Sequence, residues 1–170
     1  MEGVSILDEV GIQQKVKRLA IQILENNFEE DEIILAGINN NGHEFARLIF
    51  DTMQDNGIVD TKVTLTNIRL SPANPLSEPI TIGLPIETLK DKTIIVVDDV
   101  ANTGRTLFYA LHPVMNHVVP KRVEVAVLVD RKHKSFPIHV DYVGMDLATT
   151  FSEHIEVKIE PDGRKAVYLM

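Results

Sequence analysis

The stretch TIIVVDDVANTGRT, residues Thr93 to Thr106, decides the fold of this chain. It opens with an apolar run from Ile94 to Val97. The β-branched side chains of such a run are stiff and suit a strand that is buried on both faces. Two adjacent carboxylates, Asp98 and Asp99, end the run. From Leu107 the apolar residues recur at helical spacing, so the stretch predicts a buried strand, an acid pair, a loop and a helix.

The loop between the expected strand and helix suits an anion. It is made of small and hydroxylic residues, namely Ala101, Asn102, Thr103, Gly104 and Thr106. Backbone N–H groups at the start of a helix point outward, and the helix dipole favours a negative ligand there. Gly104 lets the backbone approach that ligand, and the hydroxyls of Thr103 and Thr106 can each donate a hydrogen bond.

The acid pair narrows the choice of anion. Asp98 and Asp99 would repel a bare phosphate, whereas their oxygens can accept hydrogen bonds from the 2′ and 3′ hydroxyls of a ribose phosphate. Taken alone, the acid pair is an ordinary strand end and Asn-Thr-Gly an ordinary turn, because Asn and Gly are common in turns. The complete string favours a ribose phosphate site over this alternative.

The complete string also resembles the phosphoribosyl diphosphate (PRPP) motif of the type I phosphoribosyltransferases, in which a hydrophobic strand, an acid pair and TGRT occur in this order. Those enzymes join a nucleobase or an amine to ribose 5-phosphate and release pyrophosphate in the presence of Mg²⁺. The resemblance implies that Asp98 and Asp99 are catalytic and hold the ribose hydroxyls. It implies no direct metal ligand, since Mg²⁺ would be bound through PRPP near the acid pair. The implied PRPP site consists of Asp98, Asp99, Ala101, Asn102, Thr103, Gly104, Arg105 and Thr106.

Length and composition indicate the general class of protein. A chain of 170 residues suggests one domain over residues 1–170, and 44% hydrophobic with 25% charged residues suits an ordinary globular core. No apolar run reaches the roughly 18 residues of a membrane span. The chain does not begin with a basic segment followed by an apolar one, and it has no cysteine. We therefore expect a cytoplasmic protein without disulfides.

The apolar spacing predicts an α/β fold. Residues 8 to 27 have the pattern of an amphipathic helix with Asp8 as N-cap, and a second helix carries Phe45 to Met53. We expect further strands at residues 33–38, 63–70, 123–129 and 138–143, and a C-terminal hairpin over residues 155–169. This alternation predicts a mainly parallel sheet of four or five strands, flanked by helices, with Asp98 at the C-terminal end of a central strand. The resemblance implies the same single-domain architecture.

A loop from Gly37 to Gly42 is expected after the strand at residues 33–38, and it carries Asn39, Asn40 and Asn41. Ligands of open α/β sheets bind beyond the carboxyl ends of the strands. In the resembled family this position grips pyrophosphate, often with a Lys or Arg. Asparagine can donate to phosphate, but without charge assistance the bonds are weaker. Taken alone, the loop could also be a plain turn.

Two cations complete the expected pyrophosphate site. Arg47 falls inside the expected second helix, so Arg69, at the start of the proline-rich segment, is the nearest cation that could serve a pyrophosphate, and Arg131 resembles a family cation near the leaving group. Each could instead be an ordinary surface arginine, or for Arg131 a partner in a local salt bridge. The expected pyrophosphate-binding residues are thus Asn39, Asn40, Asn41, Arg69 and Arg131.

A proline-rich segment of about residues 70–87, here called the hood loop, separates two expected core strands. Pro72, Pro75, Pro79 and Pro85 prevent continuous regular structure. The segment resembles the flexible loop that closes over PRPP in this family, and closure would exclude water from the reaction. The alternative is a surface loop without a role.

Other segments resemble one subfamily, the pyrimidine operon attenuators that are also uracil phosphoribosyltransferases. They are the opening ILDE, AVLVDRKH with the following FPI and DYVG, and SEHIEVKIE. This resemblance implies transfer of ribose 5-phosphate from PRPP to uracil, and a homodimer or higher homo-oligomer. Purine relatives usually place an Asp where this chain has Asn102, and an amide is no general base at neutral pH.

The alternative function is a nucleotide-sensing, RNA-binding regulator of pyrimidine genes with weak or no catalysis. A modest set of basic residues could serve it: Lys132, His133, Lys134 and His139, with Lys15, Lys17 and Arg18 on the first expected helix. The formal net charge of −8 gives no general attraction to RNA, and Met145 stands where the attenuators usually carry Lys. We therefore expect weak RNA binding. A non-catalytic scaffold is the least favoured reading because the PRPP motif is intact.

Overall fold

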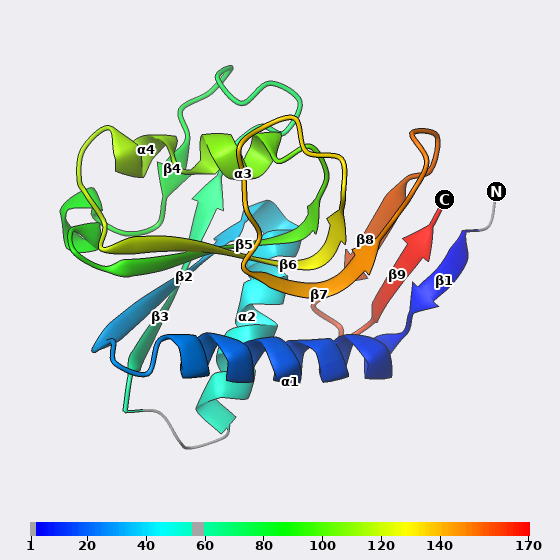
Figure 1. Ribbon diagram of the computed structural model, residues 1–170, viewed down its shortest axis with the longest axis horizontal. Coiled ribbons are helices and arrows are strands. Elements are labelled where there is room, and N and C mark those ends of the chain that lie inside the picture. The colour runs from blue at the N-terminus through cyan, green and yellow to red at the C-terminus, as the bar shows by residue number, and fades with distance from the viewer. Residues whose placement is uncertain (1–2, 56–59) are drawn as a thin grey trace.

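Strand β5, Thr93–Ala101, lies inside a six-stranded sheet with the strand order β4-β3-β2-β5-β6-β7. The computed structural model describes residues 3–55 and 60–170 of the chain (Figure 1). Five strands run parallel, and the short β4 pairs antiparallel with β3 at one edge. Their bounds are β2, Glu32–Ile38; β3, Lys62–Arg69; β4, Thr81–Ile82; β6, Arg122–Arg131; and β7, Tyr142–Leu147.

Helices cover both faces of this sheet. The helices α1, Glu9–Asn26, and α2, Asn39–Asp55, pack on one face. The other face is covered by α3, Arg105–Ala110, α4, His112–Met115, and the 3-10 helix η1, Ile86–Leu89. The side chain of Asp8 caps α1 as expected, because its Oδ1 accepts the Gly11 N–H at 2.8 Å.

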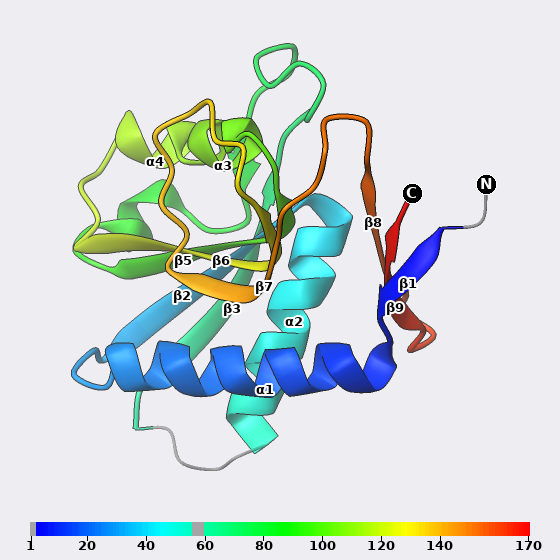
Figure 2. The ribbon, with the colours of Figure 1, turned by 45° about the vertical axis from the view of Figure 1, so that its right-hand side comes forward.

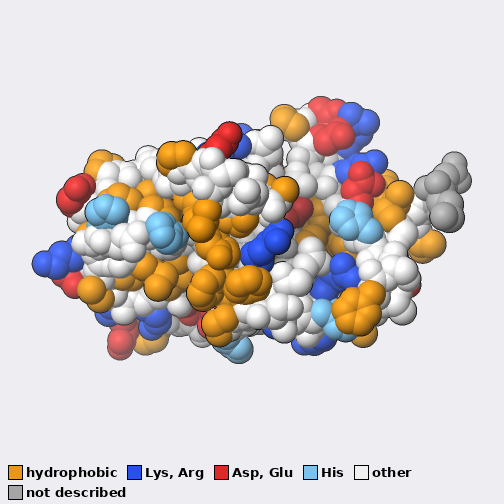
Figure 3. Space-filling model, turned by 90° about the horizontal axis from the view of Figure 1, so that it is seen from above, with side chains coloured by type: hydrophobic (Ala, Val, Ile, Leu, Met, Phe, Trp, Pro, Cys, Tyr) orange, Lys and Arg blue, Asp and Glu red, His pale blue; other side chains and the backbone are white. Residues whose placement is uncertain are grey.

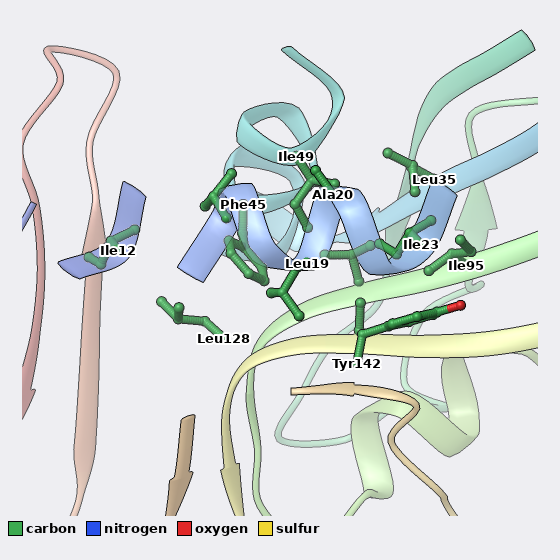
Figure 4. Packing of buried hydrophobic residues seen from close by; sticks show 14 of the residues in the cluster. Ile12, Leu19, Ala20, Ile23, Leu35, Phe45, Ile49, Ile95, Leu128 and Tyr142 are labelled. Atoms are coloured by element: carbon green, nitrogen blue, oxygen red, sulfur yellow. The ribbon is translucent and has the colours of Figure 1, made fainter. Parts of the chain in front are cut away.

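Two apolar clusters hold the three layers together. Figure 4 shows Leu19 and Ile23 of α1 in one cluster with Phe45 of α2 and Ile95 of β5. These four side chains are buried, and burying one large apolar side chain contributes roughly 1.5–3 kcal/mol. The second cluster joins alternate residues of the same strands, such as Ile94 and Val96 of β5, to α3, α4 and the hood loop.

This alternation sets the direction of the acid pair, because successive side chains of a strand point to opposite faces. Asp98 has the parity of Val96, which packs on the α3 side, yet its Oδ1 also lies close to Gly42 of α2. Asp99 has the parity of Val97 and so points toward α2. Both carboxylates therefore lie at the edge of the sheet where α2 begins.

A second sheet is built from both ends of the chain. Its order is β1-β9-β8, from β1, Val4–Leu7, β9, Lys165–Leu169, and β8, Ile155–Ile159, with antiparallel pairing throughout. The hairpin of β8 and β9 confirms the sequence prediction, with Gly163 in its turn at φ 98°. The strand β1 was not predicted. Figure 2 shows this small sheet standing beside α2, at the end of α1 where the chain begins.

The predicted α/β class and central position of β5 are confirmed, and three details are corrected. The sheet has six strands rather than four or five, because Thr81–Ile82 within the hood loop adds an edge strand. The strand expected at residues 138–143 begins only at Tyr142. Before it, the N–H groups of Ser135 and Phe136 donate to the Thr103 carbonyl, which holds this segment against the PRPP motif instead of the sheet.

The expected loop from Gly37 to Gly42 is the third correction. Strand β2 continues through Ile38, and α2 begins directly at Asn39. Asn39 makes the junction with φ 52°, a left-handed conformation that Asn tolerates better than most residues. The three asparagines thus form the first turn of a helix. Within the described residues, no helix combines the length and the apolar character needed to cross a membrane.

Candidate active site

The acid pair lies near the C-terminal end of β5. Asp98 is only 8% exposed, and its Oδ1 accepts the N–H of Asp99 at 2.9 Å. Asp99 Oδ1 accepts the N–H of Val100 at 2.9 Å, so both carboxylates are fixed by the backbone that follows them. Burial raises the pKa of the Asp98 carboxyl well above its usual range, and the nearby charge of Asp99 raises it further.

The PRPP motif encloses a pocket of about 390 Å³. Its lining consists of Pro72, Asp98 and the continuous run from Val100 to Leu107. Gly104 has φ 86°, a backbone conformation that favours glycine, and a Cβ there would also crowd the side chain of Ile138 at 3.2 Å. All eight residues of the predicted PRPP site therefore lie in or beside one cavity.

A second pocket of about 590 Å³ adjoins the first. The two share five lining residues, namely Pro72, Asp98, Val100, Asn102 and Thr106, and so form one cleft. The remaining lining of the second pocket comprises Ile38, Asn39, Asn40, Asn41, Asp99, His154, Ile155, Glu156 and Val157. The floor of the cleft is the acid pair, and its walls come from α2, the PRPP motif and β8.

The side chains of the three asparagines all have protein partners. Asn39 pins the start of the hood loop, since its Oδ1 accepts the Leu70 N–H at 3.1 Å and its Nδ2 donates to the Leu70 carbonyl at 3.0 Å. Asn40 Oδ1 accepts from Arg69 Nη1 at 2.7 Å. The structure therefore brings Arg69 beside the asparagines, which line one end of the cleft, and their part in binding pyrophosphate stays a prediction.

Arg131 does not contact the asparagines of α2 or Arg69. Its guanidinium donates to Asn102 Oδ1 at 3.0 Å, to Thr149 Oγ1 at 2.6 Å and to the carbonyls of Thr150 and Glu153 at 3.1 and 3.0 Å. These contacts place Arg131 beside Asn102, where it ties the turn before β8 to the PRPP motif. The structure does not group it with the asparagines and Arg69.

The hood loop contacts the pocket of the PRPP motif at Pro72. Arg105 Nη2 donates to the carbonyl of Pro72 at 2.7 Å, which joins the PRPP motif to the hood loop. Pro72 lines both pockets as a consequence. Figure 1 shows the hood loop rising above the sheet near α3.

The sequence did not predict the wall of the cleft formed by His154 to Val157. The pairing register of the β8–β9 hairpin explains why this edge is available. His154 and Met170 exchange both backbone hydrogen bonds, and Glu160 N donates to Arg164 O. Because bonded and non-bonded pairs alternate in an antiparallel ladder, the N–H and C=O groups of Ile155 and Val157 point away from β9. That free edge faces the acid pair.

The donor set suits Mg²⁺ only when a ligand brings further oxygens. The described residues contain no group of three or more His, Cys, Asp or Glu side chains placed to hold a metal ion. Mg²⁺ commonly binds through one or two carboxylates plus substrate phosphates and water. Asp99, which faces the cleft, and its neighbour Asp98 fit that mode.

Two of the basic residues considered for RNA are paired with carboxylates. Lys132 Nζ bonds Asp146 at 2.7 Å, and Lys134 Nζ bonds Asp130 at 2.5 Å. Arg18 donates to the carbonyls of Val143 and Gly144. On the face seen in Figure 3, Lys and Arg side chains are scattered and do not form a continuous patch.

Comparison with known proteins identifies the family. The pattern of the family described as "Phosphoribosyl transferase domain" matches residues 4–162. A protein of Streptococcus thermophilus named "Bifunctional protein PyrR" is 36% identical over 171 residues, covering 100% of this chain and 98% of the relative. A protein of the same name from Clostridium acetobutylicum is 37% identical, covering 91% of this chain and 89% of the relative.

Solved structures of phosphoribosyltransferases are also similar to this chain. A hypoxanthine-guanine phosphoribosyltransferase from Bacillus anthracis superposes with a TM-score of 0.70 at 25% identity, covering 89% of this chain and 87% of that one. A hypoxanthine phosphoribosyltransferase from Staphylococcus aureus has the same fold, with a TM-score of 0.70 at 18% identity over 87% of this chain and 79% of that one. This chain belongs to the phosphoribosyltransferase family.

Proposed function

We propose that this protein transfers ribose 5-phosphate from PRPP to uracil. A ring nitrogen of the base forms a bond to C1′ of the ribose, the bond from C1′ to pyrophosphate breaks, and the nitrogen loses its proton. The observation that carries the proposal is the double pocket, in which an anion-binding loop and a carboxylate pair share one cleft. A sugar phosphate needs both.

The smaller pocket suits the 5′-phosphate. Its wall is backbone and hydroxyl groups of residues 100–107, which can donate hydrogen bonds to phosphate oxygens. The acid pair then lies where ribose hydroxyls can donate to it. Asp99 is held by the backbone N–H of Val100, so it can orient the sugar without first being ordered.

The end of the cleft lined by Asn39, Asn40 and Asn41, here called the asparagine corner, suits pyrophosphate. Arg69 is its charged donor, the side chains of Asn39 and Asn40 are neutral donors, and Asn41 can offer its backbone N–H at the start of α2. Hydrogen bonds to a charged donor are about twice as strong as neutral ones, so Arg69 contributes most. Asp98 and Asp99 would lie beside Mg²⁺ bound through PRPP, and the ion would neutralise charge that develops on the leaving group. The carboxylates also stabilise positive charge on the sugar in the transition state.

The choice of uracil rests on the subfamily resemblance and on Asn102. This side chain lines both pockets, and its Oδ1 accepts from Arg131, so it cannot accept a proton from a purine nitrogen as an Asp could. The solved neighbours are named for hypoxanthine and guanine, so the base must be measured. We also propose a cytoplasmic location, which a cysteine-free chain suits.

The deciding experiment incubates the protein with PRPP, Mg²⁺ and one base at a time, following pyrophosphate. Uracil, hypoxanthine, guanine, xanthine, adenine and orotate form the panel. We expect turnover with uracil and much slower turnover with the others. The variant that replaces both Asp98 and Asp99 with Asn should fold but lose PRPP binding in calorimetry. Unchanged affinity in that variant would disprove the assignment of the acid pair.

The alternative, an RNA-binding regulator, is not favoured by the structure's charges. The pairing of Lys132 and Lys134 with carboxylates leaves little positive potential for a phosphate backbone. Nucleotide sensing without RNA binding would still use the same cleft. Turnover with uracil would separate the enzyme from a regulator that only binds.

A further inference from the structure

One amide nitrogen joins three elements of the cleft. Asn41 lies in the first turn of α2, and its Nδ2 donates to Asp99 Oδ2 on β5 at 3.0 Å and to the Val157 carbonyl on β8 at 3.1 Å. An amide NH₂ carries two hydrogens, so it can serve both acceptors at once. Asn41 is 116 residues from Val157 in the sequence. This contact joins the C-terminal sheet directly to the acid pair.

The pairing pattern of β8 with β9 explains why the Val157 carbonyl can accept the hydrogen bond from Asn41. Val157 belongs to a pair that is not hydrogen-bonded to β9, so its carbonyl points toward the free edge of the small sheet. An unpaired carbonyl on an edge strand needs a partner when it is removed from water. Asn41 supplies that partner, and the same contact sets the distance between β8 and β5.

We infer that Asn41 is a positioning residue that couples the orientation of the Asp99 carboxylate to the seating of β8. The inference rests on the proposed function, since it assigns Asp99 to the ribose. Asp99 Oδ1 is already fixed by Val100, and Asn41 fixes Oδ2, so the plane of the carboxylate is determined by both contacts. The remaining lone pairs are left for the ribose hydroxyls.

A neutral donor at position 41 affects the charge of Asp99 differently from a cation. A cation at this position would pair with Asp99 and lower its negative charge, whereas the amide orients the carboxylate and leaves its charge intact. Asn41 therefore aligns two walls of the cleft and preserves the acceptor that the sugar needs. Its part in binding pyrophosphate is limited accordingly, because both of its amide hydrogens already have acceptors.

Replacement of Asn41 with Asp tests this coupling, because the shape is kept while both donors are removed. At neutral pH the new carboxylate would face Asp99 and the Val157 carbonyl, and kcat/KM for PRPP should fall roughly tenfold or more. As the pH decreases, the new carboxyl takes up a proton and can donate to Asp99, so activity should recover. Other titratable groups of this pocket are Asp98, His154 and Glu156, and Arg69 bonds the adjacent Asn40. Wild type contains these groups too, so the difference between the two profiles isolates position 41.

Two further variants complete the design. Asn41→Ala should lose a similar factor at every pH, without recovery, because it can donate at none. Asn116→Asp, on exposed surface beside His112, is the matched control and should keep the wild-type profile. If Asn41→Asp followed the wild-type pH profile, the positioning role would be refuted.

A second measurement does not depend on activity. Amide hydrogen exchange over residues 153–160 should be faster in Asn41→Ala than in wild type, because β8 loses its tie to α2. Unchanged exchange there would refute the coupling. If instead wild type formed no nucleotide from any base while exchange responded as expected, the proposed function would fail and the mechanical coupling would stand.

Discussion

At Asp98 the ionised carboxylate that the proposed function uses is the form that burial makes unfavourable for folding. Its carboxyl is almost fully buried, and that burial raises its pKa well above the usual range. Because the folded-state pKa lies above the unfolded one, folding favours the protonated form. The contribution of this group to stability is fully present below the unfolded pKa and is lost as the pH rises through the folded pKa.

We expect Asp98→Asn to stabilise the protein at neutral and alkaline pH. The amide resembles the protonated acid, and its oxygen can still accept from the Asp99 N–H. The unfolding midpoint should rise by a few degrees at pH 8, since about 1 kcal/mol corresponds to roughly 2–4 °C for a domain of this size. The gain should shrink as the pH falls toward the unfolded pKa, while PRPP affinity is lost.

Calorimetric scans from pH 4 to pH 9 would test this prediction. Asp51→Asn, on the exposed side of α2, is the control and should show no such pH-dependent gain. A lower midpoint for Asp98→Asn at pH 8 would mean that the ionised carboxylate stabilises the fold.

Arg69 carries the second residue-level prediction. Its guanidinium donates a hydrogen bond to Asn40, so it lies beside Asn39, Asn40 and Asn41 at one end of the cleft. We expect Arg69→Gln to raise KM for PRPP by about 10-fold to 100-fold, since a hydrogen bond to a charged group contributes roughly 1.5–3 kcal/mol. Initial-rate kinetics with varied PRPP measure the effect.

The matched control is Arg47→Gln, an exposed arginine of α2 that pairs with Glu44. It changes the net charge equally and should leave KM for PRPP within about twofold, because exposed ion pairs contribute little. An equal rise in both variants would attribute the effect to net charge rather than to the site.

At the level of elements, the first turn of α2 passes close to the end of β5. A Cβ added at Gly42 would lie 2.8 Å from the Val97 carbonyl and 3.2 Å from Asp98 Oδ1. We expect Gly42→Ala to push α2 away from β5, with a loss of about 1–3 kcal/mol as in other overpacked sites. Urea unfolding should show the loss, and PRPP affinity should decrease with it.

Gly11→Ala is a useful comparison in α1. The added Cβ would meet side-chain atoms of Leu7 and Asp8, which can adjust, and Ala gains up to about 1 kcal/mol of helix propensity over Gly. Its stability should therefore change much less. If Gly42→Ala were equally neutral, the close approach of α2 to β5 would not constrain the acid pair.

These elements also show what sequence could and could not predict. The long helices and core strands were predicted because their apolar spacing is local, as in α1 and β5. The strand β1 was missed because it is four residues long and pairs with β9 at the other end of the chain. The start of β7 was misplaced because Ser135 and Phe136 bond Thr103, a contact that no local pattern encodes.

The same division applies to the candidate site. The PRPP residues were predicted together because they are contiguous in sequence. The wall of β8 and the contacts of Arg131 depend on how the second sheet sits against the first. The bond from Asn41 to Val157 spans the whole fold, so only the assembled structure could show it.

At the scale of the whole molecule, charge governs any interaction with RNA. Release of counterions by Lys and Arg supplies most non-specific affinity for nucleic acid. This chain has 17 Lys and Arg against 25 Asp and Glu, and Lys132 and Lys134 are paired with carboxylates. A protein that binds RNA despite such a balance needs a dense local patch. The face shown in Figure 3 presents separated basic side chains instead.

We therefore expect no sub-micromolar binding to a pyrimidine-leader RNA at physiological salt, measured by gel shift with and without uridine nucleotides. Replacing Asp146 with Asn offers a sharper test, because it frees Lys132 Nζ from its partner at 2.7 Å and reduces the net negative charge. If electrostatics limit binding, this variant should bind RNA more tightly, with the gain increasing as salt is lowered. Tight, salt-insensitive binding by the wild type would contradict the argument, because it would require recognition that does not depend on phosphate contacts.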